Sequence, residues 1–288
     1  MTRIPARRGF SVRMFLPDGD PDGVKVVEKS NWTGCSLIIP RALYGDAKTR
    51  PELARAGVYL LVGQAEASPL PQVYVGEGDP LRPRLDQHAK LKDFWTHAVA
   101  FTSKDQNLNK AHVQHLEARL VALAAASKRC VLDNGNIPQA PSLSDADTAE
   151  VEGFLDDVLL CLPLLGYDYF APAPAAATSV APLHLTAKGL KASGFESAKG
   201  FVVSAGSQAA KKEVISIHSY LKEIRAELIR QGVFVDRENF YELTQDYTFA
   251  SPSTASGVMQ DRSSNGRIEW KTADGRTLKS IQDPQVSA

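Results

Sequence analysis

Long hydrophobic runs are missing from this sequence of 288 residues. No stretch reaches the roughly 18 apolar residues that a membrane-spanning helix requires. The start, MTRIPARRGFSVRMF, carries arginines without the apolar segment of a secretory signal. Cysteine is scarce as well: the three cysteines are far apart and show neither a disulfide framework nor a zinc-binding spacing. We therefore expect a protein without a membrane segment, in the reducing environment of the cytoplasm.

An excess of charge of either sign is also missing, because 33 Lys and Arg residues balance 33 Asp and Glu residues. Domains that bind nucleic acid are often strongly basic, so the overall charge does not favour such a partner. It does not exclude one, because a local basic patch is enough to contact phosphates. The hydrophobic fraction of 43% and the charged fraction of 23% are those of an ordinary globular protein.

A break in composition divides the chain into two parts. Residues 171–182, APAPAAATSVAP, are rich in Ala and Pro and carry no charge, which is typical of a semi-rigid linker. We assign residues 51–170 to a first domain and residues 1–50 to an N-terminal extension that packs on it. Residues 183–282 form a second domain. The length of 288 residues suits two domains of ordinary size.

Short runs rich in β-branched and aromatic residues predict the strands of the first part. They lie at Val58–Val62, Val73–Val75 and Trp95–Thr102, with three more in the extension at Phe10–Leu16, Val24–Glu28 and Cys35–Ile39. Apolar residues at helical spacing predict helices at Asn107–Ser127 and from Ser144 to about Leu162. Asp79 before Pro80 is typical of a helix start, and the helix there begins at that point or nearer Arg82.

The second domain is predicted to mix strands and helices. We expect a hairpin around Lys188–Gly194, strands at Phe201–Ser204 and near Phe240–Thr244, a helix at Lys211–Gln231, and a final hairpin that turns at Asp274-Gly275. A short helix follows the segment SPS, where Ser251 or Ser253 would cap it. The whole chain is therefore expected to be an α+β protein.

Five side chains between residues 57 and 117 are candidates for chemistry. Tyr59 and Tyr74 each sit in a predicted strand near a glycine. Arg84 and His88 are four residues apart and so share one face of a helix. Glu117 lies at the border of the apolar stripe of its helix, where a carboxylate can point into a cleft. Each residue alone is more often an ordinary core or surface residue than a functional one.

The order of these residues resembles the GIY-YIG nuclease family. The matching pieces are Gly57-Val58-Tyr59, Tyr74-Val75-Gly76, Arg84-Leu85-Asp86-Gln87-His88 and Glu117, within a region of roughly residues 56–166. The resemblance implies a small three-stranded antiparallel sheet flanked by helices. The C-terminal part, with SPSTASGVMQ and NGRIEW, looks like a small domain of unknown function that is often attached to one branch of this family.

The resemblance also implies roles for the residues in a metal-dependent endonuclease that hydrolyses phosphodiester bonds in DNA. Glu117 would bind Mg²⁺ (or Mn²⁺), and Arg84 would hold the phosphate oxygens. Tyr59 would act as general base on water or hydrogen-bond it, Tyr74 would help to position it, and His88 would contact the phosphate or share a proton. One of Asn134 and Asn136 would correspond to an asparagine near the site.

Contacts to nucleic acid are expected at Gly76, at Asn134, and at Lys188 and Lys191 in the locally basic start of the second domain. Two alternatives stay open: a nuclease-like module that binds nucleic acid without cutting it, and a component that interacts with protein. The sequence does not decide between DNA and RNA or between site-specific, branched and modified substrates. It does not determine the oligomeric state either.

Overall fold

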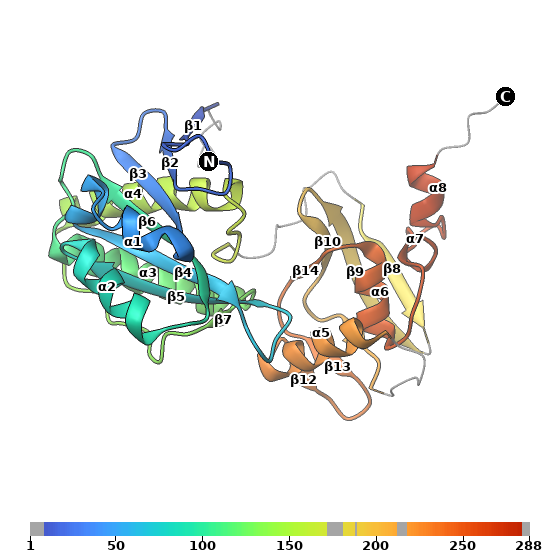
Figure 1. The fold of residues 1–288 in the computed structure, drawn as a ribbon. Coiled ribbons are helices and arrows are strands. Elements are labelled where there is room, and N and C mark those ends of the chain that lie inside the picture. The colour runs from blue at the N-terminus through green and yellow to red at the C-terminus, as the bar shows by residue number, and fades with distance from the viewer. Residues whose placement is uncertain (1–8, 172–180, 188, 212–217, 284–288) are drawn as a thin grey trace. The chain divides into compact units, whose positions relative to one another are not determined.

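The computed structural model describes residues 9–171, 181–187, 189–211 and 218–283 (Figure 1). Two compact units make up the chain: the first consists of residues 1–66 and 70–171, and the second of residues 67–69 and 172–288. Most of the predicted linker, and Lys188, lie outside the described residues. No helix in the described ranges is long and apolar enough to cross a membrane.

Three antiparallel strands form the centre of the first unit, as the sequence predicted. They are β4 (Gly57–Gln64), β5 (Pro71–Gly78) and β6 (Trp95–Ser103). Strand β4 lies between the other two and pairs antiparallel with both. Each strand is longer than its predicted apolar run, because the ladder of backbone hydrogen bonds continues through the flanking glycines and polar residues.

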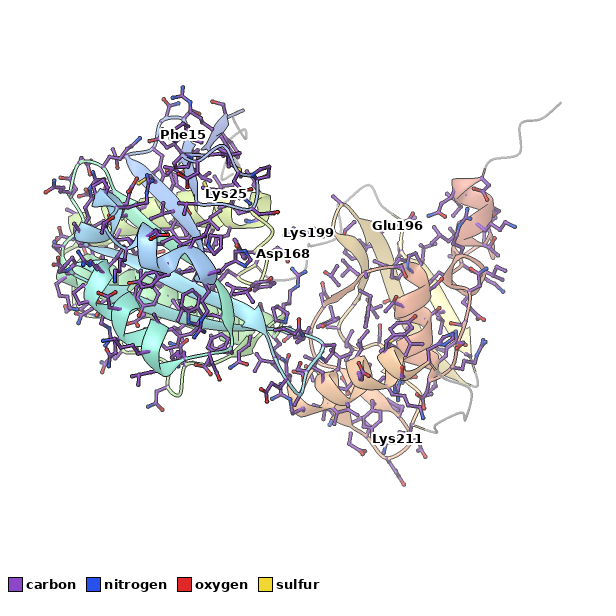
Figure 2. The ribbon with its side chains drawn as sticks, in the orientation of Figure 1. Phe15, Lys25, Asp168, Glu196, Lys199 and Lys211 are labelled. Atoms are coloured by element: carbon purple, nitrogen blue, oxygen red, sulfur yellow. The ribbon has the colours of Figure 1, made fainter. Side chains whose placement is uncertain are left out.

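The sheet is larger than predicted, because it has seven strands in the order β1-β2-β3-β6-β4-β5-β7. The expectation of a three-stranded sheet is therefore wrong. The N-terminal extension supplies β1 (Val12–Phe15), β2 (Lys25–Lys29) and β3 (Gly34–Pro40), and β7 (Val131–Leu132) pairs in parallel with β5. An open edge of β6 would leave backbone donors and acceptors unpaired, and β3 satisfies them along seven residues. Phe15 on the outermost strand is 59% exposed (Figure 2).

Two long helices cover one face of this sheet. They are α3 (Lys110–Ser127) and α4 (Asp145–Leu164), and their apolar residues share a core with Val58, Leu60 and Val75. The side chains of Asn109 and Ser144 cap the two helices by accepting the backbone N–H groups of His112 and Asp147. The predicted start of a helix at Ser144 is confirmed.

Shorter elements cover the opposite face. They are η1 (Arg41–Leu43), α1 (Tyr44–Ala47), η2 (Pro51–Ala54) and α2 (Leu81–Leu91). Side chains alternate along a strand, so Tyr59 and Leu61 point to this face while Val58 and Leu60 point to the other. Asp79 does not cap α2, because Pro80 occupies the cap position and no side chain accepts there. Pro83 falls in the first turn, where a missing N–H does no harm.

The second unit contains two small antiparallel sheets. One has the order β14-β10-β9-β8 and the other β11-β13-β12. Their strands are β8 (Leu183–Ala187), β9 (Leu190–Ser197), β10 (Gly200–Val203), β14 (Tyr247–Phe249), β11 (Gln208–Ala209), β13 (Tyr241–Leu243) and β12 (Phe234–Asp236). Figure 2 labels Glu196 of β9 and Lys211 after β11. The mixed α+β class is thus confirmed.

Two expectations for the second unit need correction. Helix α5 (Ser219–Arg230) is shorter than the predicted 211–231, since Lys211 and His218 are not helical and residues 212–217 lie outside the description. The expected final hairpin is two short helices, α7 (Gly266–Glu269) and α8 (Leu278–Gln282), joined by one bridge between Lys271 and Thr277. The Asp274-Gly275 turn is present. The strand expected before it is replaced by α7, because the Asn265 side chain caps a helix there.

Candidate active site

The two tyrosines come together because β4 and β5 are paired. Tyr59 lies opposite Gly76, and Tyr74 lies opposite Leu61, so the two phenols are diagonal neighbours on the face covered by α2. Their ring centroids are 6.2 Å apart. Tyr59 is fully buried, and its hydroxyl has no hydrogen-bond partner in the described part of the chain.

Gly76 makes room for the Tyr59 ring. A Cβ atom added at Gly76 would lie 2.4 Å from both the Cζ and the hydroxyl oxygen of Tyr59. The glycine was expected to allow close approach of a backbone or a phosphate. The group that approaches it is the phenol of the strand beside it, so any larger residue would displace Tyr59.

Helix α2 places His88 against both tyrosines. The imidazole centroid is 4.7 Å from the Tyr74 ring and 5.9 Å from the Tyr59 ring. His88 is 7% exposed, and neither ring nitrogen has a hydrogen-bond partner among the described residues. Burial, together with the positive charges of Arg84 and Lys92, lowers the pKa of His88 to about 4. The ring is therefore neutral at pH 7 and keeps one unprotonated nitrogen.

Arg84 lies one helical turn before His88 and is exposed, with its guanidinium donating to the Gln87 side chain at 3.2 Å. Burial raises the pKa values of Tyr59, Tyr74 and Glu117, and the positive charge of Arg84 opposes each rise. The ring contacts of His88 with both tyrosines place the helix that carries Arg84 beside them.

Glu117 approaches the same neighbourhood from α3. Its carboxylate is only partly exposed and has no hydrogen bond or ion pair among the described residues. Burial, then the nearby carboxylate of Glu77, raises the pKa of Glu117 to about 7, and Arg84 and Lys110 oppose the rise. Glu77 is itself neutralised, because the ammonium of Lys110 lies 2.6 and 2.8 Å from its two oxygens.

The tyrosines themselves are protonated at neutral pH. Burial raises the pKa of Tyr59 far above its ordinary value, and Tyr74 and Glu117 add to this while Arg84 opposes it. Burial also raises the pKa of Tyr74. Both phenols therefore carry a proton that each can donate in a hydrogen bond.

Glu117 is the group that fits a metal ion. A partly buried carboxylate without a partner, next to a second carboxylate, gains from a divalent cation. No group of three or more His, Cys, Asp or Glu side chains in the described ranges could enclose a metal. A cation at Glu117 would thus keep most of its water ligands, as Mg²⁺ does in many protein sites.

Asn134 closes the edge of β5 beside the site. Its amide oxygen accepts the backbone N–H of Val75 at 2.9 Å, and its amide nitrogen donates to the Val75 carbonyl at 2.8 Å. Both polar atoms of this predicted nucleic-acid contact are therefore engaged with the strand. Asn136 lies on the exposed loop that follows.

Lys92 is a residue of this site that the sequence analysis missed. Its ammonium lies 4.5 Å from the centre of the Tyr74 ring and pairs with Asp133. Asp133 in turn accepts a hydrogen bond of 2.8 Å from Gln72. No spacing in the sequence signals these contacts, because the residues come from α2, the loop after β7, and β5.

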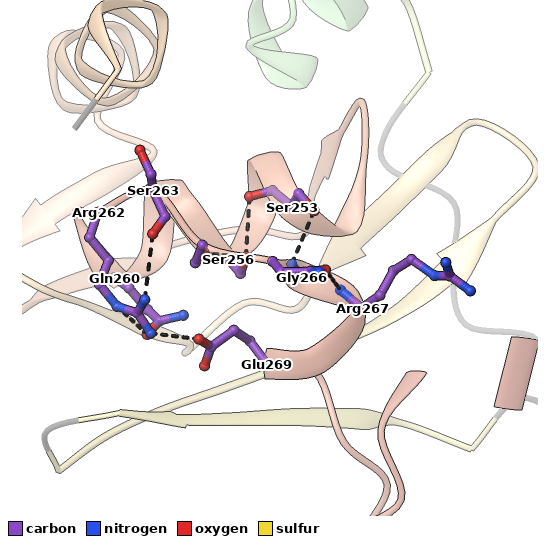
Figure 3. Close-up of polar contacts among 10 residues, drawn as sticks. Ser253, Ser256, Gln260, Arg262, Ser263, Gly266, Arg267 and Glu269 are labelled. Carbon is purple, nitrogen blue, oxygen red and sulfur yellow. Dashed lines mark hydrogen bonds and ion pairs between the residues drawn. The ribbon is translucent and has the colours of Figure 1, made fainter. Parts of the chain in front are cut away.

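In the second unit, the SPS and NG segments build a closed loop. The Ser253 hydroxyl accepts the backbone N–H of Gly266 at 3.0 Å (Figure 3), and the Trp270 indole donates to the Pro252 carbonyl at 3.0 Å. Ser251, one of the two predicted caps, accepts the Thr254 N–H and starts α6 (Pro252–Gln260). A Cβ atom at Gly266 would lie 2.1 Å from the Pro252 carbonyl group. These residues therefore stabilise the fold of the second unit. Arg262 forms an ion pair with Glu269 near them (Figure 3).

Lys191 is exposed on β9, and its backbone N–H donates to the Gln208 side chain. Its ammonium forms no ion pair or hydrogen bond with a described residue, and can therefore contact a phosphate. The other predicted lysine, Lys188, lies outside the described residues.

Comparison with known proteins identifies only the second part of the chain. Residues 183–282 match the family described as Domain of unknown function (DUF4357). No curated protein and no solved structure matches the sequence. The match begins at residue 183, after the last residue of the candidate site, Glu117, so the resemblance of the first part to a nuclease stays a prediction.

Proposed function

We propose that the first unit is a metal-dependent endonuclease that hydrolyses phosphodiester bonds in DNA, and that the second unit targets it. One observation carries the proposal. Two phenols from paired strands and a neutral histidine meet with ring centroids 4.7 to 6.2 Å apart, and an exposed arginine lies one helical turn before that histidine. The partly exposed carboxylate of Glu117, which forms no hydrogen bond or ion pair with a described residue, completes the set. Structural ion-pair networks also shift pKa values, but they do not leave a partly buried carboxylate unpaired.

Arg84 is suited to bind the phosphate. Its planar guanidinium is exposed, donates to the neutral Gln87 side chain, forms no ion pair with a described residue, and matches the oxygens of a phosphodiester. In hydrolysis a water oxygen attacks phosphorus, one P–O bond breaks, and negative charge grows on the nonbridging oxygens. A guanidinium already in place stabilises that charge without reorganisation.

The proton chemistry falls to Tyr59, Tyr74 and His88. The two phenols are protonated, so we assign them the orienting of the attacking water and phosphate by hydrogen-bond donation. His88 is unprotonated at pH 7, so we assign it a share in the proton that the water loses. Tyr59 as general base, or as a hydrogen-bond partner of the water, stays a prediction.

Glu117 would hold Mg²⁺ or Mn²⁺. When bound, the cation supplies Lewis-acid stabilisation of the phosphate oxygens and makes a coordinated water more acidic. Glu117 contributes an oxygen ligand whose charge has no competing partner in the described part of the chain.

Cleavage assays test the proposal. The purified full-length chain is incubated with plasmid, linear, single-stranded and branched DNA and with RNA, in MgCl₂, in MnCl₂ and in excess chelator. We expect metal-dependent cutting, reduced about 100- to 1,000-fold in Arg84→Ala and in Glu117→Gln. Arg82→Ala is the matched control, because Arg82 is an exposed arginine of the same helix that faces Asp86. Full activity in chelator, or in Glu117→Gln, contradicts the proposal.

Binding without cutting distinguishes the alternative function. If the wild-type protein binds an oligonucleotide but leaves every substrate intact with both metals, the first unit is a nucleic-acid-binding module. If the wild-type protein and Arg84→Ala bind the oligonucleotide equally well, Arg84 does not contact its phosphate.

A further inference from the structure

The first unit has a polar cavity of about 400 Å³ at one end of its sheet. It lies where β4 begins and where β5 and β6 end. Arg55, Asp79, Ser103 and Gln106 line it. Neither the predicted catalytic residues nor the matched family account for this cavity.

The cavity borders the candidate active site. Gly57 and Gly78 form the last pair of β4 and β5, and Tyr59 and Gly76 pair two residues further in. Two residues of a strand span about 7 Å. The Arg55 carbonyl also accepts the backbone N–H of Leu81 at 3.0 Å, and Leu81 is the first residue of the helix that carries Arg84.

Arg55 brings a positive charge into the cavity. Its guanidinium donates to the Ser103 carbonyl at 3.5 Å and forms no ion pair with a described residue. Arg50 differs in this respect, because its guanidinium donates two hydrogen bonds, of 2.9 and 3.2 Å, to the Glu52 carboxylate. A guanidinium that is not hydrogen-bonded to a carboxylate can bind a phosphate instead.

Asp79 lines the same cavity with an exposed carboxylate. A carboxylate repels a phosphate but accepts hydrogen bonds from the amino groups of a base or the hydroxyl of a sugar. A cavity with a free cation and a free acceptor is therefore complementary to a nucleotide.

We propose that this cavity binds the nucleotide next to the cleaved bond, with its phosphate on Arg55 and its base or sugar on Asp79. The inference rests on the proposed function, since the nucleotide belongs to the strand that is cut. It adds a contact that fixes the position of the strand relative to Arg84 and Glu117.

Binding of a fluorescent oligonucleotide, followed by anisotropy at several salt concentrations, tests the proposal. Arg55→Met is expected to weaken binding about tenfold. It also reduces the slope of log K against log salt by about 0.9 for duplex or about 0.7 for single-stranded DNA, the loss of one phosphate contact. Arg50→Met, the matched control, keeps the wild-type slope. Arg55→Lys keeps the charge and therefore the slope, and covers the case in which Arg55→Met does not fold.

The results separate this inference from the proposed function. If the wild-type protein neither binds nor cuts any oligonucleotide, both fail. If it binds and cuts, and Arg55→Met retains the wild-type affinity and salt slope, only the cavity inference is overturned. Asp79→Asn is expected to weaken binding; tighter binding would show that Asp79 only repels the strand and would overturn its role.

Discussion

Replacement of Glu117 by glutamine is expected to stabilise the first unit while it abolishes cleavage. The folded protein holds a partly buried carboxylate whose pKa is about 7, against 4.5 for an ordinary glutamate. This difference corresponds to about 3.4 kcal/mol at most. Because the group is still in partial contact with water, screening reduces the expected gain to about 1–2 kcal/mol. For a domain of this size, the melting temperature would rise by about 2–8 °C.

The pH dependence follows from the same difference. The unfolded chain loses the Glu117 proton near pH 4.5 and the folded chain near pH 7, so the folded state binds more protons in this interval. Stability due to Glu117 therefore falls as the pH rises from about 4.5 to 7, and the full loss is present above pH 7. The advantage of Glu117→Gln is expected to be largest at pH 8 and to shrink toward zero near pH 4.5.

Thermal unfolding by circular dichroism at pH 5 and pH 8 measures this effect. Asp156→Asn is the matched control, because it removes an exposed carboxylate from α4 of the same unit. Addition of MgCl₂ should raise the melting temperature of the wild-type protein and not that of Glu117→Gln, since a ligand stabilises the state that binds it. An equal or lower melting temperature for Glu117→Gln at pH 8 would refute the reasoning that this carboxylate is desolvated and unpaired.

Three further substitutions test the surroundings of the site and the second unit. Gly76→Ala places a Cβ 2.4 Å from the Tyr59 hydroxyl and should abolish cleavage, whereas Gly153→Ala on α4 meets no atom within 4 Å and should stabilise by about 0.5–1 kcal/mol with full activity. Lys92→Met removes the cation above Tyr74 and should lower both the cleavage rate and, by about 0.5–1 kcal/mol, the stability, with partial recovery in Lys92→Arg. Ser253→Ala leaves a backbone N–H without its acceptor and should lower the stability of the second unit by about 1 kcal/mol, measured by urea unfolding. If Gly76→Ala keeps its cleavage activity, or if Lys92→Met or Ser253→Ala keeps the wild-type stability, the role given to the altered contact is refuted.

The strands and helices of the first unit could be predicted because their signals are local. Apolar and β-branched residues mark β4, β5 and β6, and helical spacing marks α3 and α4. The size of the sheet could not be predicted in this way. Whether β3 joins the edge of β6 depends on pairing between residues 34 and 103, and such pairing leaves no pattern within either segment.

The limits of local sequence signals also explain why the predicted hairpin at the C-terminus was wrong. Asp274-Gly275 is a good turn signal, and the turn is present. The strands expected on either side are absent because Asn265 and Thr277 cap short helices there. A capping side chain favours a helix over only a few residues, and a turn signal favours a hairpin over a similar length. The sequence therefore did not distinguish short helices from short strands here.

The sequence by itself determined the identity and the order of the candidate site residues, because the ordered set of Tyr59, Tyr74, Arg84, His88 and Glu117 resembles the pattern of a known family. Only the tertiary structure decided their state. Burial against neighbouring elements keeps the phenols protonated, makes His88 neutral and raises the pKa of Glu117, which has no ion pair among the described residues. Desolvation and the approach of Arg84, Lys92 and Glu77 are properties of packing in three dimensions, and no spacing along the chain encodes them.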